Sequence, residues 1–192
     1  MTNMVATADR SLVLPTGLIS ATADGRITFN PSTGRENSTW LPVPATVLMA
    51  YICPKDTPSR LVVGDASGTV ATYTLPLLHK VDESKVSNSP ITALALHESS
   101  GGSKLLVGDE RGGIHVLGED IPGGCLRLFQ VGRKVDIIRT ECEQISLYMG
   151  WDCEIRHWNG DISSPPRKPL TPPNPPVRRV RQERLSLGSL PA

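Results

Sequence analysis

Two stretches of this chain repeat almost the same text. Residues 61–73 read LVVGDASGTVATY and residues 105–117 read LLVGDERGGIHVL, 44 positions later. In each, an apolar run meets Gly-Asp, two variable residues and a Gly, and then β-branched residues return. Val, Ile and Thr favour strands, and a Gly close to an Asp supplies the positive φ of a tight turn. Each stretch therefore predicts a β-hairpin.

Two fainter copies of the hairpin flank this pair. They are LISATADGRITF at residues 18–29 and LYMGWDCEIRHWNG at residues 147–160. The β-branched anchors of the four copies are separated by 43, 44 and 41 residues and are Ile27, Val70, Ile114 and Ile155. We expect Gly25, Gly68 and Gly112 to be turn residues. A constant period in the forties indicates a repeat array in which each repeat is one supersecondary unit.

The rest of each period also has the composition of short strands. Such segments occur at 39–43, 46–52, 91–97, 125–131 and 135–140. Each period thus holds about four strands, and no run is long and periodic enough for a helix. Four-stranded units at this period are typical of β-propeller blades. We therefore predict an all-β, propeller-like array of four-stranded antiparallel blades over residues 1–162, either partial or closed as a small propeller.

The hairpins resemble the WD-repeat family, over residues 16–160. The closest copy ends in Trp158-Asn159, where the family has Trp-Asp, while Tyr73 and Leu117 stand at the Trp position of the middle repeats. The Gly-His dipeptide of the family is absent, so we expect its buried His–Asp hydrogen bonding to be absent too. His115 and His157 lie in alternating strands, where we expect surface or groove positions. The resemblance implies a divergent propeller that binds proteins.

The number of repeats leaves three arrangements open. The expected strands make about three and a half blades, and residues 4–14 would add one or two strands and bring the total to four. These arrangements are a closed four-bladed propeller, a ring made by two copies of the chain, and a truncated product or half of a split propeller whose other half lies on another chain. Exposed blade faces and strand edges favour association. We favour an incomplete arc that associates.

Composition changes after Asp161. Residues 163–192 contain eight prolines, six basic residues and one acidic residue, a net charge of +5, while the rest of the chain carries −4. We expect a disordered Pro-rich basic tail, because polyproline II has three residues per turn and several prolines recur at that spacing. Residues 173–178 also resemble Pro-x-x-Pro-x-Arg ligands of Src-homology-3 type domains. The candidate partner-binding residues are Pro166, Pro169, Pro172, Pro173, Pro175, Pro176, Arg178 and Arg179.

No catalytic, metal-binding or cofactor-binding pattern emerges from the sequence. Nucleophile elbows, phosphate loops and zinc or calcium motifs are missing, and the histidines and cysteines have no ligand spacing. Asp65 and Asp109 recur at one repeat position, where an Asp beside a turn Gly bonds nearby backbone N–H groups. No apolar run reaches membrane-spanning length, and the cysteines form no C-x-x-C pair. We expect a cytoplasmic protein, or a nuclear one in a eukaryote, with no membrane partner.

We therefore predict a non-catalytic scaffold for protein–protein interactions, without cofactor or small-molecule substrate. Its partners would be other proteins, or a second copy of the chain. A nucleic-acid-associated factor is the alternative, because the basic tail can contact phosphates. A propeller enzyme, with residues drawn from loops of different blades, is the third hypothesis.

Overall fold

The structure is a computed structural model of the chain. It describes residues 3–6, 11–51, 59–99, 102–118, 121, 124–141, 144–150, 152, 154–159 and 167. Its sixteen strands, β1 to β16, are all antiparallel to their neighbours. Within the described ranges, no helix is long and apolar enough to cross a membrane.

The strands form four sheets, and we call these sheets blades 1 to 4 in chain order. Blade 1 contains β2 (Ser11–Leu14), β3 (Gly17–Ala21), β4 (Arg26–Pro31) and β5 (Asn37–Trp40). Blade 2 contains β6 (Ala45–Tyr51), β7 (Arg60–Asp65), β8 (Thr69–Thr74) and β9 (Lys80–Lys85), with β1 (Asn3–Ala6) added beside β6. Blade 3 contains β10 (Ile91–Ser99), β11 (Gly102–Asp109), β12 (Gly113–Leu117) and β13 (Cys125–Gln130). Blade 4 contains β14 (Val135–Glu141), β15 (Gln144–Met149) and β16 (Glu154–Trp158).

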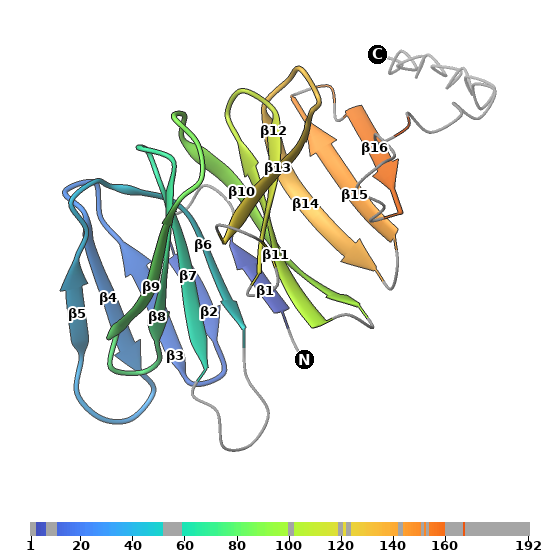
Figure 1. Cartoon of the computed structure of the whole chain (residues 1–192). Helices are drawn as coiled ribbons and strands as arrows, with labels where there is room; N and C mark the ends of the chain where they lie inside the picture. Colours follow the sequence, from blue (N-terminus) through green and yellow to red (C-terminus); the bar gives the residue numbers. More distant parts are fainter. Residues whose placement is uncertain are drawn as a thin grey trace, which may run out of the picture.

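The four blades stand side by side as an open arc (Figure 1). The substantial contacts between blades in the described part of the chain join only successive blades, mainly through the strands β2, β6, β10 and β14. Blade 1 and blade 4 lie at opposite ends of the arc. Neither β1 nor β2 pairs with β16, so the structure has the open form rather than the closed four-bladed ring.

Three clusters of buried apolar side chains hold the arc together. Each cluster lies between two successive blades. It is built from strand residues whose side chains point toward the neighbouring blade. The innermost side chains include Phe29 between blades 1 and 2, Leu94 between blades 2 and 3, and Ile145 between blades 3 and 4. The apolar residues at alternate positions of the predicted strands are thus the ones buried on the face that contacts the next blade.

A glycine allows close approach at two of the junctions, between blades 2 and 3 and between blades 3 and 4. A Cβ on Gly64 would lie 2.5 Å from Ile91 Cγ2, and one on Gly108 would lie 2.9 Å from Val135 Cβ. Ile91 and Val135 are the first residues of the innermost strands of blades 3 and 4, and both are fully buried. The incoming blade therefore seats a β-branched side chain directly on the backbone of the blade before it.

A threonine hydroxyl beside each of these contacts bonds both blades. Thr46 Oγ1 lies 3.0 Å from the Gly64 carbonyl oxygen, and it also lies within hydrogen-bond distance of the Ile91 carbonyl oxygen. Thr92 Oγ1 lies 3.3 Å from the Gly108 carbonyl and 2.5 Å from the Val135 carbonyl. Both threonines sit at a register shift of the innermost strand, which turns the side chain toward the next blade.

Blade 4 lacks both of these features. Ile137 pairs with Tyr148, as Val47 pairs with Gly64, so Tyr148 stands at the glycine position. Asp136 stands at the threonine position, where its carboxylate accepts the Gly150 N–H at 2.7 Å. The Arg139 guanidinium covers the Tyr148 ring, 5.4 Å from its centroid. The packing that joins blades 2, 3 and 4 therefore has no counterpart on the outer face of blade 4.

The expected strands and turns are confirmed. Gly25, Gly68 and Gly112 all have positive φ, at 94°, 90° and 83°. Residues 4–14 contribute two strands, as predicted, but only β2 completes blade 1. The other, β1, joins the innermost edge of blade 2, and blade 4 keeps three strands.

Candidate binding groove between blades 2 and 3

An open groove of about 560 Å³ lies between blades 2 and 3. One wall is the segment that follows β9, and the other is formed by the β11–β12 turn and by β13. Most of the lining side chains carry hydrogen-bonding groups. The lining residues are Lys85, Val86, Ser87, Asn88, Ser89, Asp109, Arg111, His115, Cys125, Arg127 and Gln130.

Asp109 is a buried member of this lining that organises the β11–β12 turn. Its Oδ1 accepts hydrogen bonds from the backbone N–H groups of Arg111 and Gly113, at 2.9 and 2.8 Å. Burial opposes ionisation, but the bonds from Gly113 and His115 outweigh it and hold the pKa of Asp109 below its usual value. Asp65 makes the same pair of backbone bonds in blade 2, so the turn role predicted for both residues is confirmed.

His115 lies beneath the groove and contacts the same carboxylate. Its Nε2 is 3.2 Å from Asp109 Oδ2, and only 4% of the residue is exposed. Of the two positions predicted for His115, the groove is therefore confirmed and the surface is wrong, and its buried contact with Asp109 was not expected. The sequence feature that allows this burial is Gly113, because a Cβ at that position would lie 2.8 Å from His115 Nε2. The smaller Gly lets the ring reach the Asp within one blade, without a Gly-His dipeptide.

Three exposed cations surround this buried pair: Lys85, Arg111 and Arg127. The Lys85 ammonium donates to the Ser67 carbonyl, and the Arg127 guanidinium donates to Gln130 Oε1. Gln130 is itself fixed, because its Nε2 donates to the Arg111 carbonyl at 3.0 Å. Within the described residues, none of the three cations forms an ion pair with a carboxylate. With His115 neutral, the lining has a net charge of +2.

Cys125 is the thiol in this groove. It is half-buried, and burial raises the pKa of its thiol above the usual value. A raised pKa keeps the thiol protonated at neutral pH, which is opposite to what an activated nucleophile requires. Among the described residues, no group of three His, Cys, Asp or Glu side chains is placed to hold a metal ion. The groove is therefore equipped for hydrogen bonding and charge recognition.

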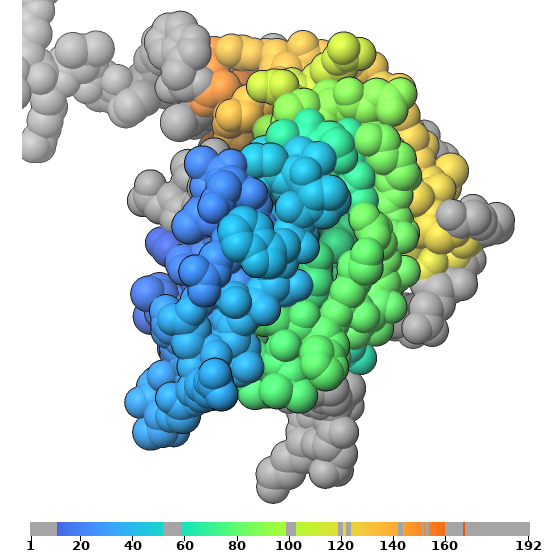
Figure 2. Space-filling model, turned by 90° about the vertical axis from the view of Figure 1, so that its left-hand side faces the viewer, coloured from blue at the N-terminus to red at the C-terminus, as the bar shows by residue number. Residues whose placement is uncertain are grey.

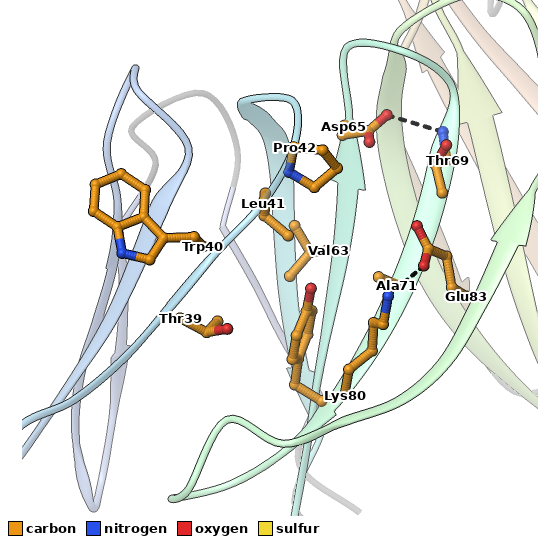
Figure 3. Close-up of a pocket in the computed structure, with 11 residues that line it drawn as sticks. Thr39, Trp40, Leu41, Pro42, Val63, Asp65, Thr69, Ala71, Lys80 and Glu83 are labelled. Carbon is orange, nitrogen blue, oxygen red and sulfur yellow. Dashed lines mark hydrogen bonds and ion pairs between the residues drawn. The ribbon is translucent and has the colours of Figure 1, made fainter.

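A smaller pocket, of about 100 Å³, occupies the equivalent junction between blades 1 and 2 (Figure 3). Lys80 and Glu83 in its lining form an ion pair at 2.5 Å, so their charges cancel. The Trp40 ring points away from Val63 and the blade 2 strands. Trp40 is 63% exposed at the end of β5, and in Figure 2 the blue surface of blade 1 lies beside the green surface of blade 2. The two junctions thus share their architecture and differ in charge.

The candidate residues of the tail lie outside the described residues. They are Pro166, Pro169, Pro172, Pro173, Pro175, Pro176, Arg178 and Arg179. Arg167 is the described position of this segment, and it pairs with His157 of β16 through two backbone hydrogen bonds of 3.0 and 2.9 Å. His157 is half-buried, and its Nδ1 lies 3.1 Å from Ser146 Oγ. The structure thus brings the start of the tail to the outer edge of blade 4.

The sequence predicts only two of the groove residues. It predicts a turn role for Asp109 and a surface or groove position for His115, and no role for Lys85, Arg111 or Arg127. Arg111 could have been found by comparing the aligned repeats, because it stands where blade 2 has Ser67. Lys85 and Arg127 could not be found in this way, since their meeting depends on how two blades pack.

Comparison with known proteins supports the architecture. No family model and no curated protein matches the chain. The computationally designed Ika4 protein aligns with a TM-score of 0.59 at 20% identity, over 77% of this chain and 87% of that chain. The BBS1N chain, solved in complex with ARL6DN, aligns with a TM-score of 0.61 at 19% identity, over 88% and 60%. Sqt1 of Saccharomyces cerevisiae gives 0.62 at 14% identity, over 86% and 47%.

These natural neighbours are β-propeller proteins. The chain has a propeller-like fold. It spans 60% of the BBS1N chain and 47% of the Sqt1 chain. At these identities the likeness concerns the fold alone.

Proposed function

We propose that this chain is a non-catalytic, WD-repeat-like module that binds other proteins through the groove between blades 2 and 3. The observation that carries the proposal is the set of hydroxyls, amides and cations that two blades place around one open groove, where the cations have no carboxylate partner among the described residues. Rigid elements keep such groups in place, so little conformational entropy is lost on binding. The scattered cysteines, which form no C-x-x-C pair, favour a reducing, cytoplasmic compartment.

The structural neighbours support the same function. One was solved as BBS1N in complex with ARL6DN, and another belongs to the structure of the mitotic checkpoint complex, at a TM-score of 0.60 and 14% identity. Both structures are complexes of more than one protein. A propeller-like chain is suited to the same general task.

A library of displayed random peptides, panned against the folded full-length chain, tests this function. We expect enrichment of a definable class of peptides that compete with one another for a single site. The control is the same chain unfolded in urea, which should enrich none of them. Failure of the folded chain to enrich any peptide above this control contradicts the proposed function.

A further inference from the structure

We propose that the groove between blades 2 and 3 recognises an acidic peptide segment, through the carboxylates of Asp or Glu side chains. This inference rests on the proposed function and names the chemistry of the partner. It concerns the arc itself, whereas the sequence pointed to the basic tail as the contact surface.

The first argument is local charge. Residues outside the tail carry a net charge of −4, yet the groove lining has a net charge of +2. Its one carboxylate, Asp109, is saturated by two backbone N–H groups and His115. The charges of Lys85, Arg111 and Arg127 therefore have no carboxylate partner among the described groove residues. A partner carboxylate would supply the missing counter-charge.

The second argument is the fixed position of the donors. Gln130 connects the Arg127 guanidinium to the backbone carbonyl of Arg111, so these parts of blade 3 are held by one side chain. Lys85 is held from the other side by the Ser67 carbonyl of blade 2. Arginine forms bidentate hydrogen bonds with carboxylates, and Gln130 orients the Arg127 guanidinium before binding. Cations from both blades can therefore approach one extended chain lying along the groove.

The third argument separates a peptide from a nucleic acid. Single-stranded nucleic acids bind to basic grooves that also offer aromatic faces for base stacking. The lining contains no aromatic ring besides the buried imidazole of His115, and it offers Ser87, Asn88 and Gln130 instead. Hydroxyl and amide groups match the backbone donors and acceptors of a peptide. The lining thus favours an acidic peptide over a nucleic acid.

The test uses the full-length chain and a fluorescein-labelled peptide of alternating Ser and Glu residues. The matched probe contains Gln in place of Glu. We expect the Glu peptide to bind at least about tenfold more tightly than the Gln peptide, with an affinity that falls as salt is added. The double variant Arg111→Glu/Arg127→Glu should weaken binding by at least about tenfold, because both positions then repel the ligand.

The matched control is Arg178→Glu/Arg179→Glu, which makes the same charge change in the tail. It should leave binding of the Glu peptide within about twofold. Arg111 and Arg127 are both exposed, and cooperative melting confirms that each double variant is folded. Equal binding of the Glu and Gln peptides overturns the proposal. Loss of binding in the tail variant alone also overturns it, as does tighter binding of a single-stranded oligothymidylate that the groove variant abolishes.

The two proposals fail in different ways. If the peptide library yields ligands that are not acidic, or that ignore the substitutions at Arg111 and Arg127, the proposed function stands and the acidic specificity is wrong. If the library yields no ligand, the proposed function itself fails.

Discussion

Replacing Gly64 by alanine should lower the free energy of unfolding by about 1–3 kcal/mol, the usual range for overpacking a core. The added Cβ would lie 2.5 Å from Ile91 Cγ2 and 2.8 Å from Val47 Cγ1, so blade 3 has to move away from blade 2. Ile91→Ala alone should cost about 2–5 kcal/mol, because it leaves a cavity at a fully buried position. Urea denaturation of both variants measures these losses.

The double variant Gly64→Ala/Ile91→Ala tests whether the two residues act as a pair. It creates the pair of small residues found at the first junction, where Ala21 and Ala45 lie in one core cluster. We expect the double variant to lose at least about 1 kcal/mol less than the sum of the single losses, since the new Cβ fills part of the cavity. Gly64→Ala combined with Ile145→Ala, in the core between blades 3 and 4, should be additive. Additive losses in both combinations would contradict the contact.

The second large effect is expected from Asp109→Ala, which should lower the free energy of unfolding by about 2–4 kcal/mol. The substitution leaves the N–H groups of Arg111 and Gly113 without their acceptor, and it removes the partner of a buried imidazole. Asp65→Ala is the matched comparison, because it breaks the same turn bonds at a position without a histidine. It should cost about 1 kcal/mol less.

The contribution of Asp109 should also depend on pH. The pKa of this carboxyl is lower in the folded chain than in the unfolded chain, so the unfolded state takes up its proton first. The stability from the carboxylate is present above the ordinary Asp pKa of about 4 and is lost as the pH falls below it. The difference in unfolding free energy between wild type and Asp109→Ala should therefore shrink between about pH 6 and pH 3. A difference that does not change with pH contradicts the charged state of Asp109.

The blades could be predicted from the sequence because their signals are local. Strand alternation and the turn glycines Gly68 and Gly112 depend on residues that are close in the chain, and the repeat period confirmed them. The path of residues 3–6 was missed, because pairing β1 with β6 rather than with β16 depends on contacts across more than forty residues. The burial of His115 was missed because it depends on the space left by Gly113.

The groove could not be predicted from the sequence for a related reason. Arg111 and Arg127 lie on one blade, but Lys85 reaches them only because blade 2 packs against blade 3. The sequence pointed to the tail as a contact surface because its basic residues lie close together in the chain. Its proposed role in partner binding stays a prediction, as does association between copies of the arc.

The distance between the two ends of the arc tests the central claim most directly. Spin labels at Val13→Cys and Arg139→Cys, in a chain whose native cysteines are replaced, would report on the exposed outer faces of blades 1 and 4. An excess of unlabelled chain removes distances between molecules. The open arc predicts a single distribution several times longer than the roughly 10 Å that separates packed sheets. A narrow distribution near that spacing would show that blades 1 and 4 meet in a closed ring, and would contradict the arc.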